Sequence, residues 1–215
     1  KGTGELAGVE LAERIFKKID AGIQFEKRMN DGETIERGNV AFVVTGEVKS
    51  ILLSERLVLN FMQRMSGIAT LTSKFVREVV GTNAQIIDTR KTTPNFRYFE
   101  KWAVRIGGGH NHRFGLYDMI MLKDNHIDFS GGISKAIAAV KDYQQKNGLN
   151  LRVEVETRTL KDIEEIIRVG GVHRIMFDNF SVEDMSEAVQ LVNGKYETEA
   201  SGGITLDTVR DYAET

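Results

Sequence analysis

The sequence predicts an α/β protein in which short buried strands alternate with amphipathic helices. Its 215 residues include 21 glycines and only 1 proline, as in chains whose strand–helix units are separated by glycine turns. After residue 81 the apolar runs become short, and apolar residues at helical spacing follow several of them. Such an alternation favours a parallel sheet, either open or closed into a barrel.

The composition argues against several classes of protein. The 29 Lys and Arg residues balance 31 Asp and Glu residues, and the formal net charge of −2 argues against a nucleic-acid coat and a polybasic membrane surface. With no cysteine, the sequence excludes disulfide scaffolds, thiolate catalysis and Cys-based metal centres. No apolar run approaches the roughly 20 residues of a membrane span, and no secretory peptide is visible. We therefore expect a cytoplasmic globular protein.

The first eighty residues have a mixed pattern. Apolar residues at helical spacing predict a helix over residues 11–19. Residues 40–44 and 48–53 are typical of strands, and Ser54 is expected to cap a long helix whose apolar stripe continues to Val79.

Six further strands and three helices are expected after Gly81. The helices cover residues 133–143, 160–169 and 182–192, the last behind a Ser181 cap. The six strands are expected at residues 84–88, 103–106, 119–122, 151–156, 174–177 and 196–200. Charged or glycine-rich residues follow each strand, and the carboxyl ends of parallel strands form the usual substrate-binding edge. This arrangement indicates an enzyme.

The loop after the first of these strands contains two adjacent cations, Arg90 and Lys91. Thr93 and Pro94 follow at positions suited to the N-cap and first turn of a helix. Cations beside a helix N-terminus form an anion site, because unpaired backbone N–H groups and the helix dipole add to their charge. The alternative is a pair of solvated surface cations.

The next loop contains Gly107–Gly109 followed by the pair His110 and His112. The glycines permit close backbone approach to a ligand, but their spacing lacks the dinucleotide-binding fingerprint. Zinc at the histidine pair is one interpretation, and the absence of further clustered His or Cys argues against it. We expect His112, beside Arg113, to form hydrogen bonds or to face an anion instead.

A lysine, two or three carboxylates and a glycine loop complete the candidate site. Lys123 provides either a fixed positive charge or a Schiff-base nucleophile. Glu154 and Glu156 share one face of a strand because they are two residues apart. They form either a buried ion-pair network or, with Asp178, a magnesium site on a phosphorylated substrate. The glycine loop at residues 201–203 resembles a phosphate loop.

Seven motifs make the sequence similar to one known family. They are ERLVLNFMQRMSGIAT (55–70), DTRKTTP (88–94), RIGGGHNHRFGLYD (105–118), LKDNHI (122–127), VEVE (153–156), FDNF (177–180) and EASGGI (199–204). All seven in this order are very specific. The sequence resembles the quinolinate phosphoribosyltransferase (nicotinate-nucleotide pyrophosphorylase, carboxylating) family.

The resemblance implies an N-terminal α/β sandwich domain over residues 1–60 and an α/β barrel domain of about seven strands over residues 61–215. It implies a homodimer in which the sandwich domain of one subunit covers the barrel mouth of the other. It also implies the reaction of quinolinate and phosphoribosyl pyrophosphate, with Mg²⁺, to nicotinate mononucleotide, CO₂ and pyrophosphate in NAD biosynthesis. Because six barrel strands are expected here, we expect a seventh after Thr215, and further residues before Lys1.

The resemblance also assigns roles to individual residues. The family residues that line the quinolinate carboxylates correspond in this sequence to Arg90, Lys91, His112 and Arg113. An arginine supplied by the neighbouring subunit is matched by Arg56. The group that contacts phosphoribosyl pyrophosphate is matched by Lys123, and the acids around the ribose and Mg²⁺ by Glu156 and Asp178. Glu154 is the alternative to Glu156. Part of the 5′-phosphate loop is matched by Ser201, Gly202 and Gly203.

Three alternatives to this function are compatible with parts of the pattern. A related phosphoribosyltransferase would act on nicotinate or another heterocycle without decarboxylation. An aldolase would use Lys123 as a Schiff base. A non-catalytic binding protein would need none of the charges at the strand ends. The full cationic set suits the two carboxylates of quinolinate best.

Overall fold

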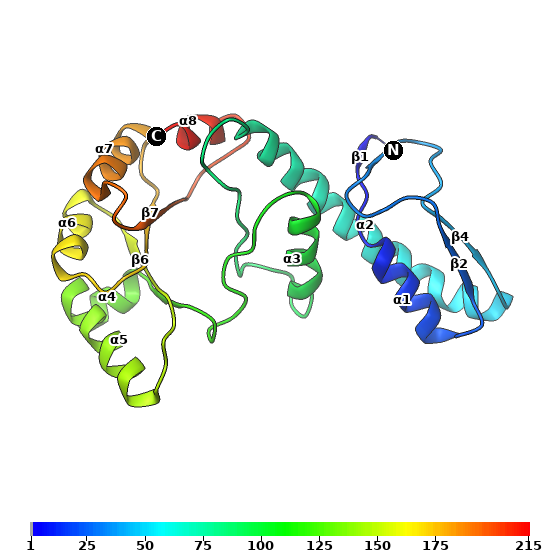
Figure 1. Ribbon diagram of the computed structural model, residues 1–215, viewed down its shortest axis with the longest axis horizontal. Helices are drawn as coiled ribbons and strands as arrows, with labels where there is room; N and C mark the ends of the chain where they lie inside the picture. Colours follow the sequence, from blue (N-terminus) through cyan, green and yellow to red (C-terminus); the bar gives the residue numbers. More distant parts are fainter. Residues whose placement is uncertain (1) are drawn as a thin grey trace. The chain divides into compact units, whose positions relative to one another are not determined.

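The structure is a computed structural model that describes residues 2–215. The chain forms two compact units (Figure 1): the N-terminal unit ends at His112, and the C-terminal unit runs from Arg113 to Thr215. The predicted α/β class is confirmed, with small antiparallel sheets in the first unit and a parallel sheet in the second. The domain boundary predicted at residues 60/61 falls inside one helix and stays a prediction. None of the helices described for residues 2–215 combines the length and apolar character of a membrane span.

The N-terminal unit is organised around the long helix α2. Its helices are α1 (Val9–Ile19), α2 (Val48–Glu78) and α3 (Arg97–Ile106). Its strands are β1 (Gly4–Glu5), β2 (Gln24–Lys27), β3 (Thr34–Ile35) and β4 (Phe42–Thr45). The pairs β1–β3 and β2–β4 are antiparallel, and α1 and α3 both pack against α2 (Figure 1).

An aromatic cluster closes the core between α1, α2 and the β2–β4 pair. The rings of Phe16, Phe25 and Phe42 lie 4.6 to 6.2 Å apart between centroids, and Val58 of α2 packs in the same cluster. Aromatic pairs at these distances contribute beyond the apolar area they bury. The helix predicted over residues 11–19 is confirmed as α1.

One continuous helix occupies the segment predicted as strand 48–53, and the predicted helix start at Ser54 is wrong. Ser54 lies inside α2, fully buried, and its hydroxyl donates to the Ser50 carbonyl at 2.8 Å. Leu52 and Leu53 lie on the solvent side of the helix and are 63% and 68% exposed. The run resembles a strand because apolar residues continue on the exposed side of the helix.

Two of the six predicted later strands are also wrong. Residues 84–88 contribute only one parallel bridge, between Ile87 and His110. Residues 103–106 form the last turn of α3, where Ala103 is fully buried against α2. The segment that bridges to Ile87 is therefore the one at His110, seven residues after the start of the predicted strand 103–106.

The C-terminal unit contains a parallel sheet with helices on one side (Figure 1). The strands, in sheet order, are β5 (Ile120–Leu122), β6 (Val153–Thr157), β7 (Arg174–Asp178) and β8 (Glu197–Ser201). The helices are α4 (Asp124–Ser130), α5 (Ile133–Asn147), α6 (Leu160–Val169), α7 (Val182–Val192) and α8 (Val209–Ala213). These four predicted strands and the three predicted helices are confirmed. The predicted Ser181 cap is confirmed too, because its Oγ accepts the Asp184 N–H at 3.1 Å.

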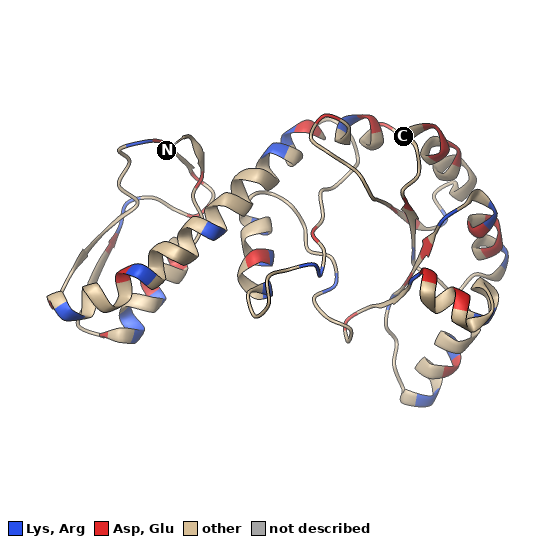
Figure 2. Ribbon diagram, turned by 180° about the vertical axis from the view of Figure 1, so that it is seen from behind, with Lys and Arg blue, Asp and Glu red and all other residues tan. Residues whose placement is uncertain are grey.

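The two faces of this sheet differ in polarity, because successive side chains of a strand point to opposite sides. Val155, Ile175 and Phe177 are at most 1% exposed and pack in one cluster with α5, α6 and α7. The strand register places the alternate residues side by side on the opposite face, which we term the polar face. The polar face carries Met121, Lys123, Glu154, Glu156, Arg174, Met176, Asp178, Glu197, Glu199 and Ser201. Charged positions on these strands are visible in Figure 2.

The run Gly107–Gly109 packs tightly against α2. A Cβ on Gly107 would lie 2.4 Å from the Ala69 carbonyl oxygen of α2, and one on Gly109 would lie 2.8 Å from the Thr72 methyl. Gly108 has φ +86°, a conformation that glycine adopts without strain. The run therefore turns the chain tightly against α2 and into the His110 segment.

Candidate functional site

Arg90 and Lys91 lie on a loop whose backbone is held from α3. Arg97 donates from Nη2 to the Arg90 carbonyl at 3.3 Å and from Nε to the Thr92 hydroxyl at 3.2 Å. The Arg90 side chain is half-buried, and within residues 2–215 its buried Nε has no hydrogen-bond partner. A buried N–H group without a partner is costly, so this atom is suited to an oxygen of an anionic ligand. Lys91 is exposed beside it.

Glu100 of α3 fixes the following part of the same loop. Its carboxylate accepts Arg64 Nη2 at 2.7 Å, the Thr93 hydroxyl at 2.8 Å and the Thr93 N–H at 3.3 Å. Burial opposes ionisation of Glu100, but these hydrogen bonds and the Arg64 charge outweigh it, so the pKa of Glu100 is lowered. The sequence predicted Thr93 as the N-cap of this helix, but the N-cap of α3 is Phe96. The helix begins at Arg97, four residues after Thr93, and Pro94 lies in the preceding turn.

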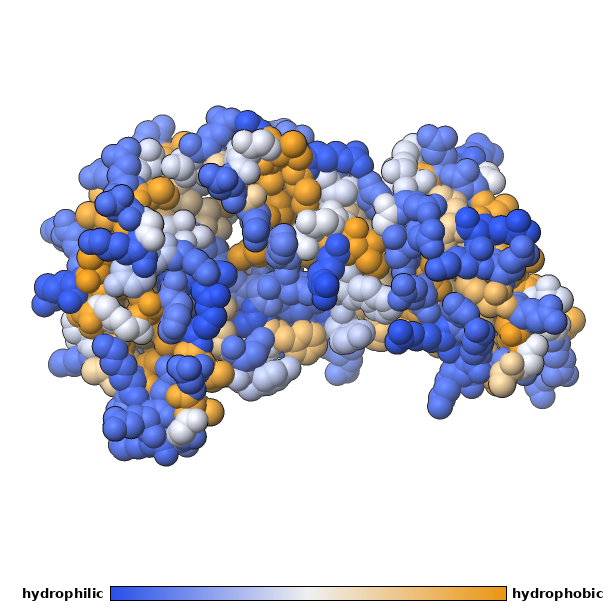
Figure 3. Space-filling view, viewed as in Figure 1, coloured by the Kyte–Doolittle hydropathy of each residue, from blue (hydrophilic) through white to orange (hydrophobic). Residues whose placement is uncertain are grey.

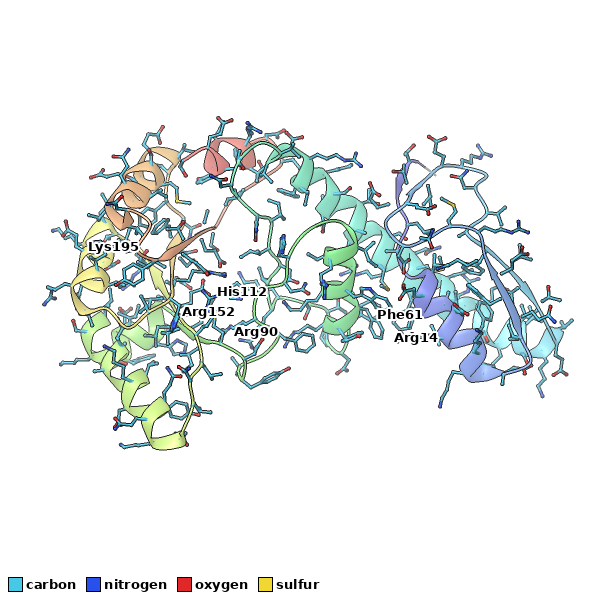
Figure 4. The ribbon with its side chains drawn as sticks, viewed as in Figure 1. Arg14, Phe61, Arg90, His112, Arg152 and Lys195 are labelled. Carbon is cyan, nitrogen blue, oxygen red and sulfur yellow. The ribbon has the colours of Figure 1, made fainter. Side chains whose placement is uncertain are left out.

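A buried ion pair joins the 88–91 loop to the His112 segment. Asp88 Oδ1 contacts Lys101 Nζ and accepts the His112 N–H at 2.9 Å. Asp88 Oδ2 accepts Asn111 Nδ2 at 2.6 Å. Lys101 also donates to the His112 carbonyl at 3.0 Å. Arg90 and His112 therefore extend from adjacent segments of the N-terminal unit (Figure 4).

Arg113 begins the C-terminal unit and is half-buried. Its Nη1 donates to the Met119 carbonyl at 3.0 Å, next to strand β5. Asp118 closes the intervening loop by accepting the N–H groups of Phe114 and Gly115 at 2.6 and 2.9 Å. Burial opposes ionisation of Asp118, but these donors outweigh it and lower its pKa.

Lys123 and Glu156 pair at the carboxyl ends of β5 and β6. Lys123 Nζ lies 3.1 Å from Glu156 Oε2, and the carboxylate is nearly buried whereas the lysine side chain is 46% exposed. The lysine backbone is fixed as well, because its N–H donates to His126 Nδ1 at 3.0 Å. An ammonium paired with a carboxylate supplies a fixed charge, which favours that interpretation of Lys123 over a Schiff base.

Glu154 lies deeper on the polar face than Glu156. It is fully buried, and the register pairs it with Arg174 of β7. Arg174 donates to Glu199 at 2.9 Å and to Glu197 at 2.9 Å. Burial would lower the pKa of Arg174, but the surrounding carboxylates of Glu197, Glu154 and Glu199 raise it. The buried Glu154 therefore lies beside the Arg174 ion pairs and interacts electrostatically with Arg174, whereas Glu156 lies at the strand end.

Asp178 and the loop at residues 201–203 meet at the carboxyl ends of β7 and β8. Asn179 donates from Nδ2 to Asp178 at 2.8 Å, and its N–H donates to the Ser201 carbonyl at 2.7 Å. Gly202 has φ +97°, and a Cβ there would lie 2.1 Å from Asn179 Oδ1. Gly203 has φ +65°. The structure thus brings the predicted acid and the predicted phosphate loop together.

Several side chains in these networks were not predicted from the sequence, among them Lys101, Asn111 and Asn179. Asn111 and Asn179 stand inside motifs that carry the family resemblance, which is the signal that marks them. Lys101 lies on a helix, where a lysine is normally exposed. Arg56, the arginine predicted to serve the neighbouring subunit, is exposed on α2.

Comparison with known proteins identifies the family. Residues 1–66 match "Quinolinate phosphoribosyl transferase, N-terminal domain", and residues 68–215 match the corresponding C-terminal domain. The chain belongs to the quinolinate phosphoribosyltransferase family. Its predicted membership is therefore confirmed.

Relatives within the quinolinate phosphoribosyltransferase family match the whole chain. Quinolinate phosphoribosyltransferase [decarboxylating] 1b of Nicotiana tabacum is 46% identical over 229 residues, and this chain spans 65% of that relative's length. The chloroplastic nicotinate-nucleotide pyrophosphorylase [carboxylating] of Arabidopsis thaliana is 45% identical over 97% of this chain and 64% of its own length. The structure of NadC from Streptococcus pyogenes has a TM-score of 0.93 and 41% identity, over all of this chain and 75% of that one.

The lowered pKa of Glu100 predicts a pH-dependent contribution to stability. Glu100→Gln should lower the free energy of unfolding at pH 7 by about 2 kcal/mol, because it weakens hydrogen bonds made by a charged group. The folded pKa lies below the unfolded one, so this contribution is present above the unfolded pKa and is lost as the pH falls through the lowered value.

Denaturant titrations of the wild type and Glu100→Gln at pH 7 and pH 3 measure this effect. The difference between the two proteins should shrink below about pH 4. A difference that is equal or larger at pH 3 would show that the Glu100 charge does not stabilise the loop.

Proposed function

We propose that this protein transfers the phosphoribosyl group of phosphoribosyl pyrophosphate to quinolinate, giving nicotinate mononucleotide, CO₂ and pyrophosphate in NAD biosynthesis. The observation that carries the proposal is the half-buried Arg90, whose buried Nε has no hydrogen-bond partner within residues 2–215, on a loop held from α3. Membership of the family supports the same reaction. A cytoplasmic location is part of the proposal, although relatives from Nicotiana glauca and Arabidopsis thaliana are named mitochondrial and chloroplastic.

Quinolinate carries two neighbouring carboxylates, and the predicted cations suit both. An arginine presents parallel N–H donors that match the two oxygens of one carboxylate, whereas lysine acts as a point charge. On the family resemblance, we assign Arg90, Lys91, His112 and Arg113 to the carboxylates. The second carboxylate is what distinguishes quinolinate from nicotinate, so the full set of charges favours quinolinate.

The polar face of the C-terminal unit suits phosphoribosyl pyrophosphate. Backbone N–H groups of a turn with positive φ, such as Gly202 and Gly203, form a concave anion site for the 5′-phosphate beside Ser201. Asp178 and Glu156 are suited to accept hydrogen bonds from the ribose hydroxyls. The exposed ammonium of Lys123 is suited to the pyrophosphate group.

Magnesium is a proposed cofactor, and the donor set is compatible with it. Glu156 and Asp178 lie on neighbouring strands and on the same face of the sheet, two positions apart in the register. One or two carboxylates together with substrate phosphates are the ligands that Mg²⁺ usually takes in such enzymes. When bound, the ion neutralises negative charge on the leaving pyrophosphate.

The chemistry needs positioning and electrostatic stabilisation more than a reactive protein group. The pyridine nitrogen of quinolinate forms a bond to ribose C1 while the C1–oxygen bond breaks, and the electron pair leaves with pyrophosphate. Glu156 and Asp178 would stabilise the positive charge that develops on the sugar. The ring carboxylate next to the nitrogen then leaves as CO₂, and the adjacent N⁺ stabilises the remaining electron pair until that carbon takes a proton. The cations hold the ring in place throughout.

A homodimer with Arg56 serving the partner subunit is also part of the proposal. Val48, Leu52 and Leu53, on the first two turns of α2, are 63% to 70% exposed. Arg56 follows them by one helical turn. Hydrophobic atoms are visible at this end of α2 in Figure 3. A second copy that covers these residues would remove them from water, which supports an interface beside Arg56.

Release of labelled CO₂ tests the reaction directly. The full-length protein is given quinolinate labelled in its 2-carboxylate, with and without phosphoribosyl pyrophosphate and Mg²⁺. We expect release only when both are present. Arg90→Met should raise the KM for quinolinate by about 10- to 100-fold, the effect of losing charged hydrogen bonds.

Arg14→Met is the matched control, because Arg14 is an exposed arginine of α1 (Figure 4), and it should leave both kinetic constants unchanged. If the folded wild type releases no CO₂, the proposed function is wrong, and a relative acting on nicotinate or another heterocycle is favoured.

Sedimentation velocity tests the dimer. Leu53→Glu puts a charge into the exposed apolar group and should convert the dimer to a monomer. Leu71→Glu is the matched control on α2, because Leu71 is also exposed, at 52%, and lies outside this group. A wild type that sediments as a monomer, or a dimer unaffected by Leu53→Glu, would contradict the proposed interface.

A further inference from the structure

Lys101 and Asp88 form a buried ion pair that the roles described so far do not use. The side chains of Lys101 and Asp88 are 3% and 9% exposed. Lys101 comes from helix α3, whereas Asp88 lies two residues before Arg90 on the loop that follows the Ile87 bridge. The pair therefore joins a rigid element to the loop that carries the substrate-facing arginine.

Both charges of the pair also hold the backbone of His112. The His112 N–H donates to Asp88 Oδ1 at 2.9 Å, and the His112 carbonyl accepts Lys101 Nζ at 3.0 Å. Asn111 extends the same network, donating from Nδ2 to Asp88 Oδ2 at 2.6 Å and to the Lys101 carbonyl at 2.9 Å. Fixing the donor and the acceptor of one residue determines the orientation of its backbone, and with it the direction of the His112 side chain.

We infer that Lys101 and Asp88 are positioning residues for recognition of the dicarboxylate substrate, because together they set the places of Arg90 and His112. This inference rests on the proposed function. Neither residue contacts the substrate in this account. They act through the backbone of the two segments that carry the ligand-binding side chains.

Stability alone does not account for a buried ion pair at this place. Two charges lose their hydration when they are buried, and well-packed apolar residues of similar volume often stabilise a protein equally well. Apolar packing is not directional, however, whereas the pair supplies hydrogen bonds that specify where the Asp88 and His112 segments lie. A ligand site needs that directional control to within about half an ångström.

The test separates positioning from stability by comparing the two substrates. In the full-length protein, Lys101→Met should raise the KM for quinolinate by at least about tenfold, the effect of misplacing groups that hold a charged ligand. The KM for phosphoribosyl pyrophosphate should stay within about twofold, because the polar face of the C-terminal unit is proposed to bind it.

A second variant covers the case in which Lys101→Met leaves the Asp88 charge buried and the protein fails to fold. The double variant Asp88→Asn, Lys101→Met removes both charges, so no unpaired charge remains. It should fold and show the same selective rise in the KM for quinolinate. Where both variants fold, the double variant should be no worse than Lys101→Met, because the two residues act as one unit.

Glu5→Gln is the matched control for a partly buried ion pair in the same unit. Glu5 pairs with Arg77 at 2.6 Å, and its side chain is 10% exposed. This variant should lower the melting temperature and change neither KM. If the folded double variant keeps the wild-type KM for quinolinate, or if both KM values rise together, the positioning role is wrong. Absence of CO₂ release from the wild type would instead refute the proposed function.

Discussion

The alternation of side chains along a β-strand is the constraint on which the C-terminal unit depends. Every second residue of β6 and β7 enters the apolar cluster beneath α5, α6 and α7, so the intervening residues must share the opposite face. Because the strands are parallel and in register, that face gathers charged residues from β6, β7 and β8, with Lys123 directly after β5. A shift of one residue in register would bury Glu156 and Asp178 beneath the helices and expose Val155 and Phe177. The apolar core therefore specifies where the charged groups lie.

The charged residues of this protein differ in how deeply they are buried. On the polar face, Arg174 pairs with Glu197 and Glu199 beside the fully buried Glu154, whereas Glu156 and Asp178 lie at the strand ends. The N-terminal unit follows the same principle. Asp88 and Lys101 are buried and paired, and Arg90 and Lys91 extend from the loop that they hold. In both units, the charges suited to a ligand are therefore the outer ones.

The sequence predicted the elements whose burial pattern is simple. Strands β6 and β7 carry buried apolar residues at every second position, and each of the strands β5 to β8 was found within about two residues of its prediction. The predictions failed where tertiary contacts changed the pattern. Leu52 and Leu53 are apolar on the exposed side of α2, which gave a helix the appearance of a strand. Ala103 and Ile106 are apolar because α3 packs on α2 there. Lys101 was missed because nothing in a sequence indicates that a helical lysine is buried against an aspartate.

The central claim is that the two faces of the sheet have separate tasks. It is tested by measuring the binding of phosphoribosyl pyrophosphate with Mg²⁺ by isothermal titration calorimetry, on two variants of neighbouring β7 residues. Asp178→Asn changes the polar face and should weaken binding by at least about tenfold, with little change in melting temperature. Phe177→Leu changes the helix-covered face and should lower the melting temperature while the Kd stays that of the wild type. An unchanged Kd for Asp178→Asn, or equal weakening by both variants, would contradict the account.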